Sequence, residues 1–215
     1  MSVKLISVTP DAEKIIGYCA RVSNPKNQDN PDVSKLLKYC IKNAHWSIFE
    51  QAFMTFEIET GCDIAPQILR HKSFNFQQFS LRYSEAMSYV PRVSRRQDTK
   101  NRQNSIDDLS EDTKQWFIDM QDQIWSSAYS VYLEALSLGI SKESARALLP
   151  MNTRTKMYMS GSVRSFIHYI QVRTEASTQK EHRDIAEAIK AIFVKELPIT
   201  SSALGWTSQA SAEGP

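Results

Sequence analysis

Cysteine is scarce in this chain and follows no metal-binding or disulfide pattern. The three cysteines, Cys19, Cys40 and Cys62, are odd in number and too far apart to form a C-x-x-C pair. This excludes a disulfide framework and a zinc site of the usual spacing. We therefore expect each cysteine to be a small buried residue in a reducing compartment, and we expect no metal site.

Long apolar runs and a strong net charge are also absent. No stretch approaches the roughly 18 apolar residues of a membrane span, and the polar segment MSVKLISVTPDAEK does not fit a signal peptide. Lys and Arg number 26 and Asp and Glu 24, which gives a formal charge of +2. A charge this close to zero gives no general reason to expect nucleic acid or a membrane as a partner. The sequence predicts a cytoplasmic protein.

The patterns that are present predict an α+β fold, with long helices packed against a small, mainly antiparallel sheet. The 215 residues fit one domain over residues 1–200 and a C-terminal tail over 201–215. Alternating and β-branched residues predict strands at 3–8, 52–60 and 155–161. Apolar residues at helical spacing predict helices at 11–23, 32–44, 62–71, 111–138, 141–149, from about 162 onward, and 181–196.

Two segments between residues 92 and 139 give more specific expectations. The basic segment RVSRRQDTKNRQN, residues 92–104, predicts a solvated loop rather than a nucleic-acid surface. The helix predicted at 111–138 should end at Gly139. Its apolar stripe is expected to consist of Trp116, Met120, Ile124, Tyr132 and Leu136.

The segment QILRHKSFNFQQFSLRYSE, residues 67–85, gathers cations and hydroxyls among aromatic side chains. Apolar residues fall at 74 and 76 and then at 79, 81 and 83. One extra residue in an extended strand would place them on one side, with Gln78, Ser80 and Arg82 on the other. Guanidinium groups hold phosphates bidentately, so this arrangement favours a phosphorylated ligand with a planar ring. Spacing alone fits a structural role equally well, with residues 70–72 complementing a helix C-terminus.

Several motifs together resemble one enzyme family. RHK followed by seven residues and a serine, at positions 70–80, closely resembles the RHR-x7-S signature of flavin-dependent thymidylate synthases, and SLRYSE extends the match. Four other segments resemble further blocks of that family in the same order, and together they cover most of residues 18–198. They are ARVS (20–23), HWSIFEQAFMTFEI (45–58), ESARALLP (143–150) and VRSFIHYIQVR (163–173).

The resemblance implies conversion of dUMP to dTMP. Methylenetetrahydrofolate would donate the carbon, FAD would carry the hydride and NADPH would be the reductant. It also implies a homotetramer that shares its active sites, and a catalytic Arg173 that contacts the uracil and favours its ionised form. The implied dUMP-binding residues are Gln67, Arg70, Gln78, Phe79, Ser80, Leu81, Arg82, Arg173 and, from a neighbouring chain, Arg146. The implied FAD-binding residues are Ser23, His45, Ser47, Glu50, Arg70, His71, Lys72, Gln78, Ser162, Arg164 and His168.

Other features of the sequence agree with a reaction carried by the flavin. No cysteine lies in the motif blocks to act as a nucleophile, and Ser80 has no G-x-S-x-G elbow, so Ser80 is interpreted as a ligand contact. There is also no G-x-G-x-x-G, so NADPH would have to bind the flavin site transiently. The chain departs from the family pattern at four positions: Lys72 replaces the second arginine of RHR, Gln78 stands for a glutamate, and His168 and Ser177 stand for asparagine and histidine.

Two other functions remain open on the residues alone. A histidine phosphatase could use His71 with Arg70 and Arg82, although Lys72 stands where such enzymes carry glycine. A non-catalytic nucleic-acid-binding module could stack bases on the phenylalanines of residues 74–79 and bind phosphates with residues 92–102.

Overall fold

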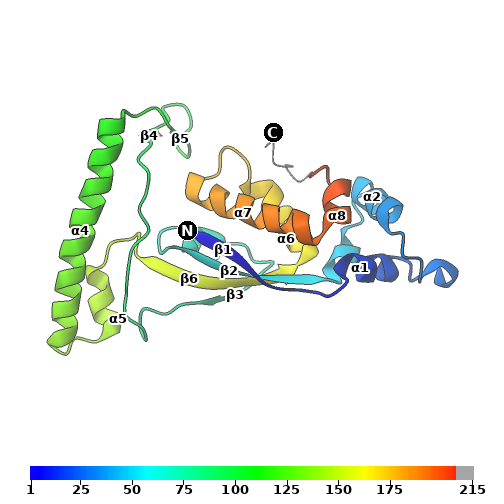
Figure 1. Ribbon diagram of the computed structural model, residues 1–215, viewed down its shortest axis with the longest axis horizontal. Helices are drawn as coiled ribbons and strands as arrows, with labels where there is room; N and C mark the ends of the chain where they lie inside the picture. Colours follow the sequence, from blue (N-terminus) through cyan, green and yellow to red (C-terminus); the bar gives the residue numbers. More distant parts are fainter. Residues whose placement is uncertain (207–215) are drawn as a thin grey trace, which may run out of the picture.

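The computed structural model describes residues 1–206 and shows an α+β fold built on a four-stranded antiparallel sheet (Figure 1). The strand order is β1-β2-β6-β3, so β6 pairs with a neighbour on both edges. The edge strand β1 contains a β-bulge at Ile6, because its register with β2 shifts between Leu5 and Ser7. A separate ribbon joins β4 and β5. The strands are β1 (Ser2–Val8), β2 (Phe53–Gly61), β3 (Asn75–Gln78), β4 (Arg96–Gln97), β5 (Ser105–Ile106) and β6 (Arg154–Ser162).

Helices cover one face of the sheet and gather at both of its ends (Figure 1). Helices α6 and α7 lie side by side on that face, α1, α2 and α8 lie at one end, and α4 and α5 at the other. None of the helices within residues 1–206 is long and apolar enough to cross a membrane. The α-helices are α1 (Ala12–Ala20), α2 (Ser34–Lys42), α3 (Ala65–Ile68), α4 (Glu111–Ser137), α5 (Lys142–Ala145), α6 (Val163–Arg173), α7 (Lys180–Glu196) and α8 (Pro198–Ala203). The 3₁₀ helices are η1 (Pro25–Asn27), η2 (Trp46–Glu50) and η3 (Arg146–Leu148).

The main core lies between the sheet and helices α6 and α7. Met54, Phe56 and Ile58 of β2 are fully buried and alternate with residues on the opposite face, as the two-residue period of a strand requires. The ring of Phe56 packs edge-to-face on Phe166 of α6, with centroids 5.0 Å apart. Each such side chain contributes about 1.5–3 kcal/mol by its burial. The strands predicted at 3–8, 52–60 and 155–161 are confirmed as β1, β2 and β6.

A close contact joins the end of β6 to the chain that enters β3. A Cβ on Gly161 would lie 2.5 Å from Cδ1 of Phe74, so only glycine leaves room for that ring. Phe74 in turn packs on Phe166, with centroids 4.8 Å apart. Ser162 follows as the N-cap of α6, and its Oγ accepts a hydrogen bond from Ser165 N at 3.2 Å. This junction links the strand pairing to the position of α6.

Helix α4 confirms the predicted helix at 111–138 but not its predicted stripe. Tyr132 is fully buried and its hydroxyl accepts a hydrogen bond from Ala86 N at 3.3 Å. Trp116 and Ile124 are 59% and 58% exposed, so they do not share that buried face. The helix projects past the sheet (Figure 1) and is covered where α5 and residues 86–92 pack on it. Gly139, with φ of +85°, follows the helix as predicted.

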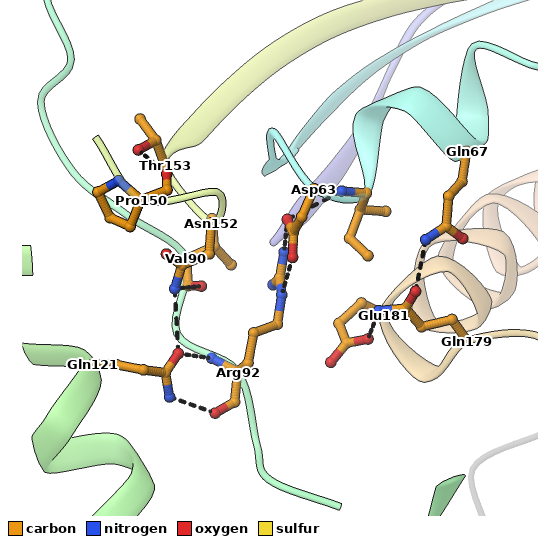
Figure 2. A network of polar contacts seen from close by, with 11 residues as sticks. Asp63, Gln67, Val90, Arg92, Gln121, Pro150, Asn152, Thr153, Gln179 and Glu181 are labelled. Carbon is orange, nitrogen blue, oxygen red and sulfur yellow. Dashed lines mark hydrogen bonds and ion pairs between the residues drawn. The ribbon is translucent and has the colours of Figure 1, made fainter. Parts of the chain in front are cut away.

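The prediction of a solvated loop at 92–104 is wrong for two of its arginines. Arg92 makes a bidentate pair with Asp63, with Nε–Oδ2 and Nη2–Oδ1 distances of 3.0 and 2.6 Å, and its side chain is only 11% exposed. Arg95 Nε donates to Ser105 Oγ at 2.9 Å. Figure 2 shows how the Gln121 amide also binds both the N–H and the C=O of Arg92, each at 2.8 Å. The segment therefore ties α4 to the end of β2.

The three cysteines differ in burial, and only Cys40 is buried as expected. Cys19 and Cys62 are half-buried, and all three are free thiols. Burial raises the pKa of Cys40 and of Cys62, which keeps both thiols protonated and unreactive.

The predicted helix at 62–71 is shorter than expected. It is reduced to α3 because Pro66 lies in its first turn and its last residues enter a turn. The predicted boundary at residue 200 falls inside α8, and residues 207–215 of the predicted tail lie outside the described residues.

Replacing Gly161 with alanine should destabilise the protein, because the added Cβ would overlap the Phe74 ring. Overpacking of this kind costs about 1–3 kcal/mol, and a lower midpoint of urea unfolding would reveal it. Adding Phe74→Leu to the Gly161→Ala variant should recover part of the loss, since leucine is smaller. Unfolding of Gly161→Ala at the wild-type midpoint would mean that the ring moves aside at no cost.

Candidate active site

The predicted cationic motif lies in the turn between α3 and β3. Two backbone hydrogen bonds close this turn, from His71 N to Ile68 O at 3.1 Å and from Phe74 N to His71 O at 3.3 Å. Arg70 and Lys72 are exposed, whereas His71 between them is half-buried. The turn therefore directs the histidine towards the protein and its two cationic neighbours towards solvent.

His71 meets Arg173, the last residue of α6. The Nε–H of Arg173 donates to Nε2 of His71 at 2.8 Å, across 102 positions of sequence. Burial, together with the neighbouring Arg173 and His168, lowers the pKa of His71 to about 4. The histidine is therefore neutral near pH 7 and offers its Nε2 lone pair to the arginine. Two separate blocks of the sequence, residues 67–72 and 163–173, converge at this bond.

Aromatic rings surround His71 on its buried side. Its ring centroid lies 4.9 Å from Tyr169, 6.1 Å from His182 and 6.4 Å from Phe74, each at an interplanar angle of 79–83°. His182 is fully buried, and its Nε2 shares a hydrogen bond with the Tyr169 hydroxyl at 3.1 Å. Burial, with Arg173 and His71 nearby, lowers the pKa of His182 to about 3, and burial raises the pKa of Tyr169. Arg173 thus faces a cluster of neutral rings.

A cleft of about 420 Å³ lies between η2 and α6, next to the motif turn. Three predicted flavin residues, Glu50, Arg164 and His168, line it. Arg164 Nη1 and Glu50 Oε1 form an ion pair at 2.5 Å that joins the two elements. The cleft combines an indole wall, a guanidinium and polar groups, which suits a planar heterocycle that carries hydrogen-bonding groups. The lining residues that the sequence analysis did not identify are Trp46, Ser73, Ser165, Ile167 and Gln171.

Helical periodicity could have identified part of that lining. Gln171 follows His168 by three positions and Arg164 by seven, so all three residues share one face of α6. Ser165 precedes His168 by three positions and carries the same signal, whereas Ser73 lies outside α6 and gave none. Their contact, from Ser165 Oγ to the Ser73 carbonyl at 3.1 Å, joins chain segments 92 positions apart.

The other predicted flavin residues lie outside this cleft. Ser23 and Ser47 line two separate hollows around α1. His45 packs edge-to-face on Tyr39, with ring centroids 5.9 Å apart. Ser162 is 8% exposed and caps α6, so its hydroxyl already has a structural role. One chain therefore brings together only part of the predicted flavin set.

The predicted two-sided strand ends earlier than expected. Strand β3 stops at Gln78, whose Nε2 donates to Thr155 Oγ1 at 3.2 Å, and the chain then turns at Ser80, whose Oγ accepts from Arg82 N at 3.3 Å. Phe79 and Tyr83 are 41% and 77% exposed, so the predicted apolar side does not exist beyond Gln78. Leu81 is half-buried and packs on the α4 core cluster.

Two predicted phosphate contacts lie on either side of Glu143. Arg82 binds the Glu143 carboxylate through Nε at 3.3 Å and Nη2 at 3.2 Å, and Arg146 Nε donates to the Glu143 carbonyl at 3.2 Å. The side chains of Arg82 and Glu143 are 56% and 55% exposed, so the pair is weak and exchangeable. This group lies near α5, at the end of the sheet opposite α1 (Figure 1).

Gln67, another predicted nucleotide contact, belongs to a third group (Figure 2). Its Nε2 donates to Gln179 Oε1 at 2.6 Å, and Gln179 Nε2 donates to Glu181 Oε2 at 3.0 Å. The bond holds α3 against the start of α7. Within residues 1–206, no hydrogen bond or ion pair joins the Arg82 group to His71, Arg173 or the cleft.

Comparison with known proteins gives consistent matches over nearly the whole chain. A family model described as "Thymidylate synthase complementing protein" matches residues 4–199. The flavin-dependent thymidylate synthase of Synechocystis sp. is 54% identical, over 96% of this chain and 100% of that protein. The probable flavin-dependent thymidylate synthase of Paramecium bursaria Chlorella virus 1 is 51% identical, over the same shares. The UMP/dUMP methylase PolB of Streptomyces cacaoi, solved with 5-Br UMP, matches with a TM-score of 0.84 at 25% identity, over 95% of this chain and 93% of that one.

Acidification should destabilise the protein through His71 and His182. Their folded pKa values of about 4 and about 3 lie below the unfolded value of about 6.5. This stabilisation is therefore complete above pH 6.5 and is lost progressively as the pH falls from about 6.5 towards the folded values. Urea unfolding between pH 7 and pH 4 should show the decline, with His182 accounting for up to ~1.4 kcal/mol per pH unit.

The matched variant for this measurement is His182→Leu, which removes one titrating ring from the core. Its free energy of unfolding should depend less steeply on pH than that of the wild type. An unchanged slope would contradict a neutral buried histidine at this position.

Proposed function

The chain belongs to the thymidylate synthase complementing protein family, and from this premise we propose which residues carry its reaction. Relatives that match over nearly the full length are named flavin-dependent thymidylate synthases, so the chain is an enzyme that converts dUMP to dTMP and depends on FAD. The observation that carries our assignment of residues is the bond between Arg173 and His71, where two motif blocks meet. Family membership does not favour the phosphatase and nucleic-acid-binding alternatives.

We assign the flavin ring to the cleft between η2 and α6. The residues present fit such a ring, because Trp46 offers an apolar wall and Glu50, Arg164 and His168 offer polar contacts around it. When bound, FAD supplies the hydride that completes the new methyl group. Lys72 lies two positions after Arg70 on the exposed side of the motif turn, and its charge complements a pyrophosphate. The other proposed contacts are Ser23, His45, Ser47, Arg70, Gln78 and Ser162.

We assign the phosphate of dUMP to Arg82 and Arg146. Both guanidinium groups are exposed beside Glu143, and a phosphate brings more charge and more acceptor oxygens than the carboxylate that Arg82 now binds. The phosphate would therefore replace Glu143 as the partner of Arg82. The other residues proposed to bind the nucleotide are Gln67, Arg70, Gln78, Phe79, Ser80 and Leu81.

Arg173 is the proposed catalytic residue. Its guanidinium cannot lose its charge at working pH, and its Nε is already fixed by His71. A fixed cation beside a pyrimidine oxygen and nitrogen stabilises negative charge that develops as the ring is activated. The neighbouring rings of Tyr169 and His182 lower the local dielectric constant, which strengthens this effect.

Methylenetetrahydrofolate is the proposed carbon donor and NADPH the proposed reductant. The motif resemblance supports both assignments. The chain carries no G-x-G-x-x-G, which supports transient binding of NADPH at the flavin site rather than at a Rossmann-type site. A cytoplasmic location stays a prediction from the sequence.

We also propose a homotetramer whose chains share their active sites. Within one chain, Arg82 and Arg146 near α5 lie towards one end of the sheet, and the proposed flavin cleft beside η2 lies towards the other (Figure 1). A neighbouring copy could therefore bring its Arg146 to the cleft. Helix α4 offers a surface for such contact. Ile124, Val131 and Leu138 are 58%, 47% and 74% exposed and recur every seven residues, a spacing typical of packing between helices. Leu148 extends this apolar seam across a shallow groove.

Charges placed on the seam should break the assembly. We expect Ile124→Lys with Val131→Lys to elute as a smaller species than the wild type in size-exclusion chromatography with light scattering, because buried lysines oppose helix contact. Leu133→Lys is the matched control, since Leu133 is also exposed but lies on the other side of α4. A double variant with the wild-type mass would remove the seam from the interface.

The function is tested by comparing the wild type with Arg173→Ala. The wild type should show oxidised-flavin absorption and form dTMP from dUMP with methylenetetrahydrofolate and NADPH. Arg173→Ala should keep its flavin but lose about 100-fold or more in dTMP formation, the usual cost of one electrostatic contact to the transition state. A wild type that cannot be reconstituted with FAD would refute the assignment, and wild-type turnover by the variant would remove Arg173 from it.

A further inference from the structure

The guanidinium of Arg173 is held along one edge only. Its Nε–H is engaged by His71, whereas among residues 1–206 no hydrogen bond or ion pair engages its Nη1 or Nη2. A guanidinium presents its donors in one plane, so fixing Nε also sets the direction of the two terminal groups. Nη1 and Nη2 therefore have a fixed direction and can still donate to a planar pair of acceptors.

The contact defines the chemical form of His71. Arginine has donors only, so Nε2 of His71 must carry the lone pair and Nδ1 the proton. A protonated His71 would set a second cation against Arg173 and break the contact. The titratable and charged groups around the ring are Arg173, His168 and Tyr169 on α6 and His182 on α7.

The ring of His71 has little freedom to turn. Phe74, Tyr169 and His182 each pack edge-to-face against it, at centroid distances of 4.9 to 6.4 Å. Tyr169 is fixed in its turn by the hydrogen bond between its hydroxyl and the fully buried His182. The acceptor atom is thus held by packing rather than by the backbone turn alone.

We propose that His71 is a positioning residue for Arg173, and that Tyr169 and His182 hold His71 in place. This inference rests on the proposed function, in which Arg173 contacts the pyrimidine. It differs from a role for His71 as a flavin contact, which the motif resemblance implies. Under our proposal, loss of the Nε2 acceptor disturbs the chemistry of dUMP and leaves flavin binding intact.

Asparagine and glutamine provide a matched pair of variants. The amide oxygen of His71→Gln can reach the place of Nε2, whereas the shorter side chain of His71→Asn cannot. We expect His71→Gln to form dTMP within about threefold of the wild type. His71→Asn should be slower by about tenfold or more, in line with the loss of a hydrogen bond to a charged group. Both should retain their flavin, measured as absorbance per chain.

The same variants in an Arg173→Lys background separate positioning from general damage. Lysine lacks the planar guanidinium that His71 orients through Nε–H. In the Arg173→Lys background, His71→Asn should therefore cause no further loss of dTMP formation. Our proposal is overturned if glutamine and asparagine cause equal losses, if flavin is lost in step with activity, or if the asparagine loss persists in the lysine background. A wild type that forms no dTMP would instead refute the proposed function, whatever the variants do.

Discussion

Strand β6 is the constraint on which the rest of the structure depends. It pairs with β2 along its whole length and with β3 over residues 157–160, so its register cannot slip without breaking both ladders. It passes into α6 through the Ser162 cap, and α6 ends at Arg173. β3 follows the motif turn directly, so the same pairing also sets the position of His71. Both partners of the central contact are thus placed by one strand.

The arginines of this chain show how burial decides what a guanidinium does. Arg92 is nearly enclosed and matched bidentately by Asp63, which makes it part of the scaffold. Arg82 also pairs with a carboxylate, that of Glu143, but both side chains are mostly exposed to solvent. A ligand can therefore replace Glu143 as the partner of Arg82. Arg173 lies between these cases, since one edge is fixed and the other is free to bind. Sequence alone does not separate the three.

The parts of the fold that follow local periodicity could be predicted, and the parts set by distant partners could not. Strands β2 and β6 and helix α4 show their periods within single segments, and their positions are confirmed. The turn at Ser80 ends β3 through a local hydroxyl contact that alternation of apolar residues does not reveal. The buried state of Arg92 depends on a carboxylate 29 positions away. His182 gave no signal at all, because its environment comes from α7 packing on α6.

The same distinction applies to the candidate site. The motif resemblance identified Arg173 and His71, yet assigned them to different ligands, and their direct contact appears only when the two segments are folded together. Helical spacing identified Arg164 and His168 as neighbours, and the cleft that they line includes η2, which no periodicity linked to them.

The edge strand β1 bears on how this sheet behaves among other chains. An edge exposes unpaired backbone groups that can recruit a foreign strand, which is how ordered aggregates begin. The bulge at Ile6 interrupts that edge and the exposed Lys4 adds a charge to it, and both features oppose pairing with a foreign strand there.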